Sequence, residues 1–156
     1  MNIFATYTPL SFAAIAVAGS ITLATTAPAQ ESGLASKQMT IWRDPNCGCC
    51  DAYAEYMEEN GYDVMRVDDR NFGKTSISVG VPAQGLGCHL AEVNGYYISG
   101  LVPVDIIERL MSERPDIVGI TLPGMPRNAP GMAWEKTGIL KTYAFGKDGI
   151  TVYSNE

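Results

Sequence analysis

Three of the four cysteines lie within four residues, as Cys47-Gly48-Cys49-Cys50, directly after the turn residues Asp44-Pro45-Asn46. Residues 39–43 form a strand candidate, and from Cys47 to Asn60 apolar residues recur at helical spacing. The cysteines are therefore predicted to open a helix, where unpaired N–H groups and the positive end of the helix dipole favour thiolate over thiol. The thiolate is both the nucleophile and the metal ligand.

Backbone geometry limits which of these cysteines can pair. Adjacent Cα atoms lie about 3.8 Å apart, whereas a relaxed disulfide needs roughly 4.4–6.8 Å. A Cys49–Cys50 bridge would therefore be strained. Cys47 and Cys50 stand three residues apart on the helix, with Cβ atoms roughly 5–6 Å apart. That spacing suits a redox pair of the Cys-x-x-Cys type, which would leave Cys49 over.

The rest of the chain alternates strand and helix signals. The first helix is predicted to bury Cys50, Tyr53, Ala54 and Met57 and to end at Gly61. The further elements, in chain order, are a strand at 62–67, a short helix within 71–80, a hairpin of 89–93 and 96–99 around Asn94-Gly95, a helix at 104–114, a loop at 121–133, and a hairpin of 142–145 and 150–153. This order predicts an α/β, thioredoxin-like fold: a central mixed sheet flanked by helices, with an added C-terminal hairpin.

The fourth cysteine, Cys88, adjoins His89, the only histidine. In glutaredoxin-like sequences a proline starts the strand that leads to the Asn-Gly turn, and this proline faces the Cys-x-x-Cys. Counting back from Asn94 places His89 at the proline position and Cys88 just before it. By that resemblance, we expect Cys88 and His89 to lie opposite the cysteine cluster. Four sulfurs and an imidazole would then converge.

Four interpretations of such a site remain open. Cys47 and Cys50 form a redox pair while Cys49 and Cys88 are simply buried, or the four cysteines form two structural disulfides. Alternatively, three cysteines and the histidine hold a structural zinc, although Cys-x-Cys-Cys is not the usual zinc spacing. The interpretation we favour is a soft ion, above all monovalent copper, because thiolates and thioethers select it. Met125 and Met132, in a loop rich in Pro and Gly, are candidate thioether ligands or ordinary gap-filling side chains.

The first 29 residues carry no charged side chain and end in the small-x-small pattern Ala27-Pro28-Ala29. The apolar run within them suits a signal peptide better than a membrane span, although an uncleaved lipid anchor is an alternative. We expect a signal peptide at 1–29, a flexible linker at 30–37 and a single metal-binding domain at 38–156. The protein would then be periplasmic, in contact with a membrane only during export. A formal net charge of −6 argues against a nucleic-acid partner.

Several motifs together resemble one family. They are Trp42–Cys50, Gly80-Val81-Pro82, Cys88-His89, Val93–Tyr96, Gly100–Pro103, Arg114–Ile117, Leu122–Pro126 and Pro130-Gly131-Met132. This combination resembles the CopG-like family of exported copper-resistance proteins, long catalogued as a domain of unknown function. The resemblance covers residues 39–153.

The resemblance implies a thioredoxin-like fold, a cysteine-bridged copper cluster and a role in copper tolerance through interconversion of the two copper oxidation states. Its motifs assign Cys47, Cys49, Cys50 and Cys88 as ligands and His89 as a ligand or neighbour. The expected partners are metal ions and other exported copper-handling proteins. One departure from the family pattern is that Gly87 precedes the Cys-His pair in place of Ser or Ala, and Leu90 follows it in place of Thr, so neither neighbour supplies a hydroxyl. The alternative function is a periplasmic thiol–disulfide oxidoreductase using Cys47 and Cys50.

Overall fold

The structure is a computed structural model that describes residues 37–133 and 137–156, all within one compact unit, Gly33–Glu156. The predicted signal peptide (1–29) and linker (30–37) lie outside the described residues, apart from Lys37. Across the described ranges, no helix is long and apolar enough to cross a membrane.

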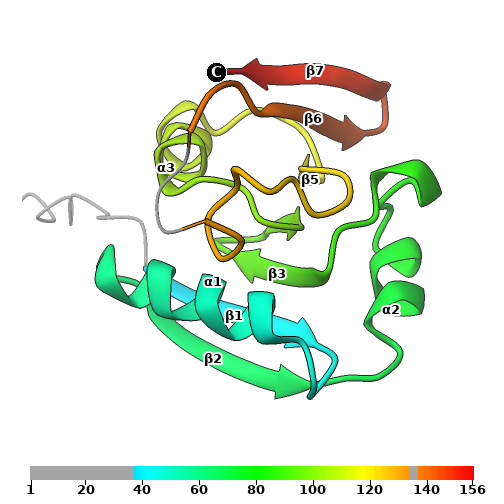
Figure 1. Cartoon of the computed structure of the whole chain (residues 1–156). Coiled ribbons are helices and arrows are strands. Elements are labelled where there is room, and N and C mark those ends of the chain that lie inside the picture. Colours follow the sequence, from blue (N-terminus) through cyan, green and yellow to red (C-terminus); the bar gives the residue numbers. More distant parts are fainter. Residues whose placement is uncertain (1–36, 134–136) are drawn as a thin grey trace, which may run out of the picture. The chain divides into compact units, whose positions relative to one another are not determined.

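A seven-stranded mixed sheet, in the order β2-β1-β3-β4-β5-β6-β7, forms the centre of the fold (Figure 1). Its strands are β1 (Gln38–Arg43), β2 (Asp63–Asp68), β3 (His89–Val93), β4 (Tyr96–Ser99), β5 (Gly119–Thr121), β6 (Lys141–Gly146) and β7 (Gly149–Asn155). The helices are α1 (Gly48–Glu59), α2 (Phe72–Ser78) and α3 (Val104–Glu113), with a 3-10 turn at Ala83–Gly85. The thioredoxin-like α/β class with a C-terminal hairpin is confirmed.

Strand β1 is parallel to β2 and antiparallel to β3, so the strand that leads into the cysteine cluster lies beside the strand that follows Cys88. Arg43, the last residue of β1, pairs with His89, the first residue of β3. The Asn94-Gly95 turn between β3 and β4 has positive φ at both residues, as a type I′ turn requires. The register thereby brings the two cysteine-bearing segments to the same end of the sheet, where β1 ends and β3 begins.

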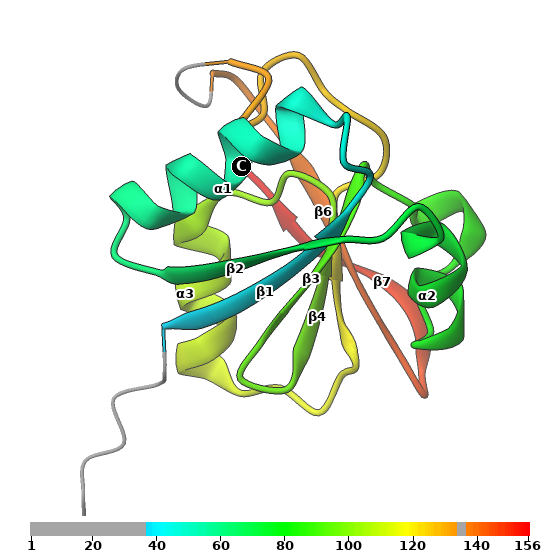
Figure 2. The ribbon, with the colours of Figure 1, turned by 90° about the horizontal axis from the view of Figure 1, so that it is seen from below.

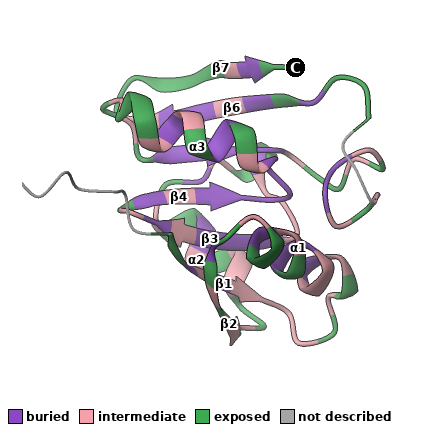
Figure 3. Ribbon diagram, turned by 90° about the vertical axis from the view of Figure 1, so that its left-hand side faces the viewer, coloured by how far each residue is buried: buried purple, intermediate pink, exposed green. Residues whose placement is uncertain are grey.

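The two faces of the sheet are covered differently (Figure 2). Helices α1 and α3 pack on one face, where the apolar core includes Ile41, Tyr53 and Leu110. Helix α2 lies towards the other face, where Leu90 and Phe145 belong to a smaller cluster. Colouring by burial shows both large helices buried towards the sheet and exposed outwards (Figure 3).

Strand β5 corrects the sequence-based expectation, which placed Thr121 at the start of a loop. Three residues are too few to show a period of two, and all three are buried. Gly119 packs against the carbonyl of Tyr97 so closely that a side chain would collide with it. Because β5 pairs with β4 on one side and β6 on the other, it joins the C-terminal hairpin to the sheet.

Candidate metal centre

The turn before α1 sets the position of the cysteine cluster. The Cys47 N–H donates to the Asp44 carbonyl at 3.0 Å, and the Asn46 N–H donates to the Asp44 carboxylate at 2.9 Å. The Cys47 carbonyl then accepts from the Cys50 N–H at 3.0 Å, in the first turn of the helix. Helix α1 buries Cys50, Tyr53, Ala54 and Met57, which confirms the predicted face.

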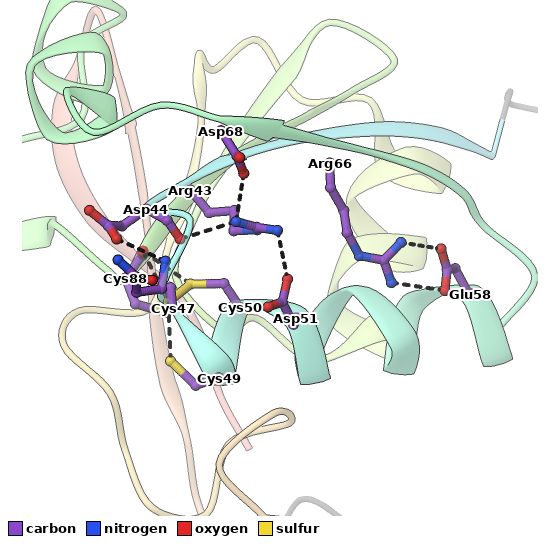
Figure 4. Close-up of polar contacts among 11 residues, drawn as sticks. Arg43, Asp44, Cys47, Cys49, Cys50, Asp51, Glu58, Arg66, Asp68 and Cys88 are labelled. Carbon is purple, nitrogen blue, oxygen red and sulfur yellow. Dashed lines mark hydrogen bonds and ion pairs between the residues drawn. A yellow bond between two sulfur atoms is a disulfide. The ribbon is translucent and has the colours of Figure 1, made fainter.

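The four cysteine sulfurs converge as expected. All four Sγ atoms, from Cys47, Cys49, Cys50 and Cys88, lie within 4.8 Å of one another. Cys88 approaches from the start of β3, and its carbonyl oxygen lies 3.2 Å from the Cys50 Sγ (Figure 4). Two segments that are 38 residues apart in the chain thus share one group of sulfur atoms.

The four sulfurs are not in the same oxidation state. Cys47 and Cys50 form a disulfide with a Cα–Cα distance of 5.3 Å, whereas Cys49 and Cys88 are free thiols. Two structural disulfides, one of the interpretations left open by the sequence, are therefore not formed. The Cys49 Sγ lies 3.5 Å from the Cys47 Sγ, so the free thiol contacts the disulfide directly.

Cys88, like Cys49, is half-buried. Burial raises the pKa of the Cys88 thiol to about 12, and the neighbouring Cys49 thiol acts in the same direction. Cys88 therefore holds its proton at neutral pH unless a cation replaces it, because a buried anion without a counter-charge is costly.

His89 lies beside the sulfur group but outside it. Its Nδ1 is 3.5 Å from the Cys88 Sγ, its ring centroid is 4.7 Å from that of Tyr53, and its side chain is fully buried. Burial lowers the pKa of His89 to about 3, so the imidazole is neutral. Its Nε2 has no hydrogen-bond partner among the described residues. The group of candidate ligand atoms that all lie within 4.8 Å of one another contains the four sulfurs and no imidazole nitrogen.

The two candidate methionines lie in different places. The Met125 Sδ is 3.9 Å from the Cys49 Sγ. Met132 instead lines a surface hollow beside Ala52, Glu55 and Tyr56 on the flank of α1. The structure thus brings one of the two predicted thioethers to the sulfur group.

Sequence reasoning missed the part that Arg43 and Tyr53 play in shaping the site. Arg43 donates to Asp68 at 2.7 Å and to the Asp44 carbonyl at 3.2 Å, and lies 3.0 Å from an Asp51 oxygen (Figure 4). It thereby ties β1, β2 and the start of α1 together. The Tyr53 hydroxyl donates to the Val102 carbonyl at 2.7 Å, which fixes the ring against His89. The position of Arg43 beside three aspartates depends on the strand register, which one sequence does not reveal.

Comparisons with known proteins agree with this geometry. A family model described as "Protein of unknown function, DUF411" matches residues 86–132, from just before Cys88 to Met132. Two solved structures, of forms 2 and 1 of the copper resistance protein CopG, are similar, each with 30% identity, a TM-score of 0.69 and 76% of this chain covered. The matches cover 97% and 96% of those chains. No curated protein sequence matches. By its fold and its identity to these structures over nearly their whole length, the chain belongs to the CopG-like family of copper-resistance proteins.

Proposed function

We propose that this protein is an exported copper-binding protein that holds Cu(I) in a thiolate cluster of Cys47, Cys49, Cys50 and Cys88, and that it acts in copper homeostasis and resistance. The observation that carries the proposal is the convergence of four sulfurs from two segments within 4.8 Å. Two sulfurs bonded to the same ion at about 2.3 Å lie at most about 4.6 Å apart. The observed spacing therefore needs only small movements to bind one or more ions.

The chemistry of the donors favours copper over zinc. The site offers only sulfur within its shared sphere, and thiolates with thioethers select Cu(I). A zinc site of three cysteines and His89 would use the His89 Nδ1, which lies 3.5 Å from the Cys88 Sγ but outside the 4.8 Å group that the four sulfurs form. Zinc is therefore the weaker candidate.

Binding by all four cysteines requires the disulfide to open. Two electrons and two protons from an external dithiol, which leaves as its own disulfide, convert Cys47–Cys50 into two thiols. Copper then displaces the protons of the thiols, including that of Cys88. Where several thiolates bridge more than one copper ion, the negative charges of the thiolates and the positive charges of the ions would neutralise each other. The positive end of the α1 dipole would stabilise the remaining negative charge.

A second candidate function rests on the same disulfide. Cys47 and Cys50 stand in a Cys-x-x-Cys arrangement at the start of α1, as in thiol–disulfide oxidoreductases. That function needs only these two cysteines, so Cys49→Ser and Cys88→Ser would leave it intact. The copper function needs all four.

Anaerobic titration of the fully reduced chain with Cu(I), with metal counted per chain, separates the two. We expect at least one tightly bound ion, and a lower count in each of the four Cys→Ser variants. Met65→Leu, which removes an exposed sulfur on β2, is the matched control and leaves the count unchanged. Fewer than one ion per chain in the unchanged protein contradicts the copper function.

A copper carrier and a copper oxidoreductase would share these ligands. Following the oxidation state of the bound copper during turnover separates them, because only the oxidoreductase interconverts Cu(I) and Cu(II). The expected partners are metal ions and other exported copper-handling proteins.

Export to the periplasm is proposed from the apolar, uncharged segment before Gln30. The test is N-terminal sequencing of the protein recovered from the periplasm. The expected first residue is Gln30, and an intact Met1 on that protein contradicts cleavage at Ala29.

A further inference from the structure

The sulfurs of the site fall into two groups when the disulfide is closed. Cys47 and Cys50 are bonded to each other and have no proton to exchange for a metal ion. Cys49 and Cys88 remain thiols. The Met125 thioether lies 3.9 Å from the Cys49 Sγ. Cys49 is therefore next to both remaining soft donors, since the Cys88 Sγ lies within 4.8 Å of it.

The exposure of these sulfurs decreases inwards. Met125 is 55% exposed, the cysteines Cys47, Cys49 and Cys88 are half-buried, and Cys50 is fully buried. An ion arriving from solvent thus meets the thioether and Cys49 before it reaches Cys50. Cys47 is equally half-buried but has no thiol to offer while it is bonded to Cys50, so the donors open to the ion are those that do not depend on opening the disulfide.

The loop that carries Met125 is anchored on both sides of the site. Gly124 forms a bridge with Gly87 and donates its N–H to the Leu86 carbonyl at 3.1 Å, immediately before Cys88. Ala129, further along the loop, is fully buried in the core.

Gly131 holds the far end of the loop against α1. A Cβ on Gly131 would lie 2.6 Å from the Cys49 carbonyl oxygen and 3.0 Å from the Tyr53 nitrogen. The loop therefore crosses the helix start in close contact. The two anchors hold the loop backbone on either side of Met125, and the fold thereby carries this residue to Cys49.

We propose that Cys49, Cys88 and Met125, named here the outer sulfur site, bind one soft monovalent ion while the Cys47–Cys50 disulfide is closed. The inference rests on the proposed function, whose four-cysteine cluster it extends to the oxidised protein. Binding involves no electron transfer. The Cys49 and Cys88 thiols release their protons to solvent, and the two thiolates and the neutral thioether then bind the ion. The thioether adds selectivity for soft ions such as Cu(I) and Ag(I) over Zn(II).

The test uses the full chain with the disulfide closed, verified by a count of two free thiols, and Ag(I) as a soft ion that does not change oxidation state. Titration in competition with a chelator is expected to give one Ag(I) per chain. Met125→Leu weakens Ag(I) binding roughly tenfold, the lower end of what losing one supporting group costs at metal sites. Zn(II) binding, measured in parallel, does not respond to Met125→Leu.

Met132→Leu is the matched control, since it removes an exposed thioether from the same loop at a position lining another hollow. It leaves Ag(I) affinity unchanged. The double variant Cys47→Ser/Cys50→Ser, which cannot form the inner disulfide, also binds one Ag(I). No Ag(I) in the closed protein, or equal weakening by Met125→Leu and Met132→Leu, overturns the outer sulfur site. If the reduced chain still binds Cu(I) through four cysteines, that result overturns this inference alone and leaves the proposed function standing.

Discussion

The inner pair, Cys47 and Cys50, and the outer pair, Cys49 and Cys88, occupy the same small volume but differ in chemistry. The inner pair is closed as a disulfide at the start of α1, while the outer pair remains reduced. The inner pair comes from one helical turn, whereas the outer pair joins two distant segments. The difference teaches that the number of free thiols at the site depends on the oxidation state of the inner pair, and that the tertiary fold brings Cys88 to the other three sulfurs.

Removing an outer thiol is expected to have the largest effect. With the disulfide closed, Cys49→Ser and Cys88→Ser each leave one thiol, so Ag(I) affinity falls beyond the roughly 10–100-fold cost of losing a group that merely supports a ligand. The measurement is competitive Ag(I) titration. If either variant binds Ag(I) as tightly as the double variant Cys47→Ser/Cys50→Ser, the distinction between the outer and the inner pair is contradicted.

The loop anchors can be tested with two glycines that both have positive φ, Gly131 at +84° and Gly124 at +71°. Alanine strains the backbone at either position, by about 1–2 kcal/mol. Gly131→Ala additionally collides with the Cys49 carbonyl, whereas a Cβ at Gly124 meets nothing within 4 Å. Urea unfolding is expected to show a larger loss for Gly131→Ala, and Ag(I) binding a matching weakening. Equal losses would show that the close approach at Cys49 does not position the loop.

Arg43 offers a way to disturb the helix start without touching a sulfur. Arg43→Gln removes the ion pairs to Asp51 and Asp68, and its own side chain is only 13% exposed. We expect the free energy of unfolding to fall by about 1.5–3 kcal/mol, the range for hydrogen bonds to charged groups.

The control for Arg43 is Arg66→Gln, which removes an exposed pair with Glu58 and costs at most about 1 kcal/mol. Denaturant unfolding measures both variants. Equal effects of the two substitutions would contradict the role of Arg43 in holding the start of α1.

The smallest expected effect concerns the pH dependence of stability at Tyr62, which follows the end of α1 that lies away from the cysteines. Burial, as the largest cause, and then Glu108 raise the pKa of Tyr62 to about 12, against 10.0 for an unperturbed tyrosine. The folded state therefore keeps this proton longer than the unfolded state, and the resulting stability, complete below pH 10, is lost as the pH rises to about 12. Tyr62→Phe flattens the decline in stability between these pH values, as measured by thermal unfolding. An unchanged decline contradicts the assignment to Tyr62.

The inner pair could be predicted from the sequence because its determinants are local. The turn residues Asp44-Pro45-Asn46, the helical spacing after Cys47 and the Asn94-Gly95 turn each act over a few residues, and the structure follows them. The approach of Cys88 is predicted from the resemblance to glutaredoxin-like sequences, because counting back from the Asn94-Gly95 turn puts Cys88 and His89 where those sequences face the Cys-x-x-Cys. The meeting of Met125 with Cys49, and the ion pairs of Arg43, depend on contacts between distant segments.

Strand β5 is likewise a feature that depends on contacts between distant segments and that local sequence patterns do not predict. Its three residues carry no periodic pattern, and its existence depends on pairing with β4 and β6. Without β5 the C-terminal hairpin could be predicted as an element but not placed on the sheet. The loop that follows β5 brings Met125 beside Cys49, so the sequence that does not reveal β5 does not place the candidate methionines either.

A crystal structure of the fully reduced chain, loaded anaerobically with Cu(I), tests the central claim most directly. The account predicts copper bonded at once to sulfurs of the helix start and to the Cys88 Sγ, with Cys47 and Cys50 no longer bonded to each other. Copper bound away from these sulfurs, or to the 47–50 segment without Cys88, would contradict it.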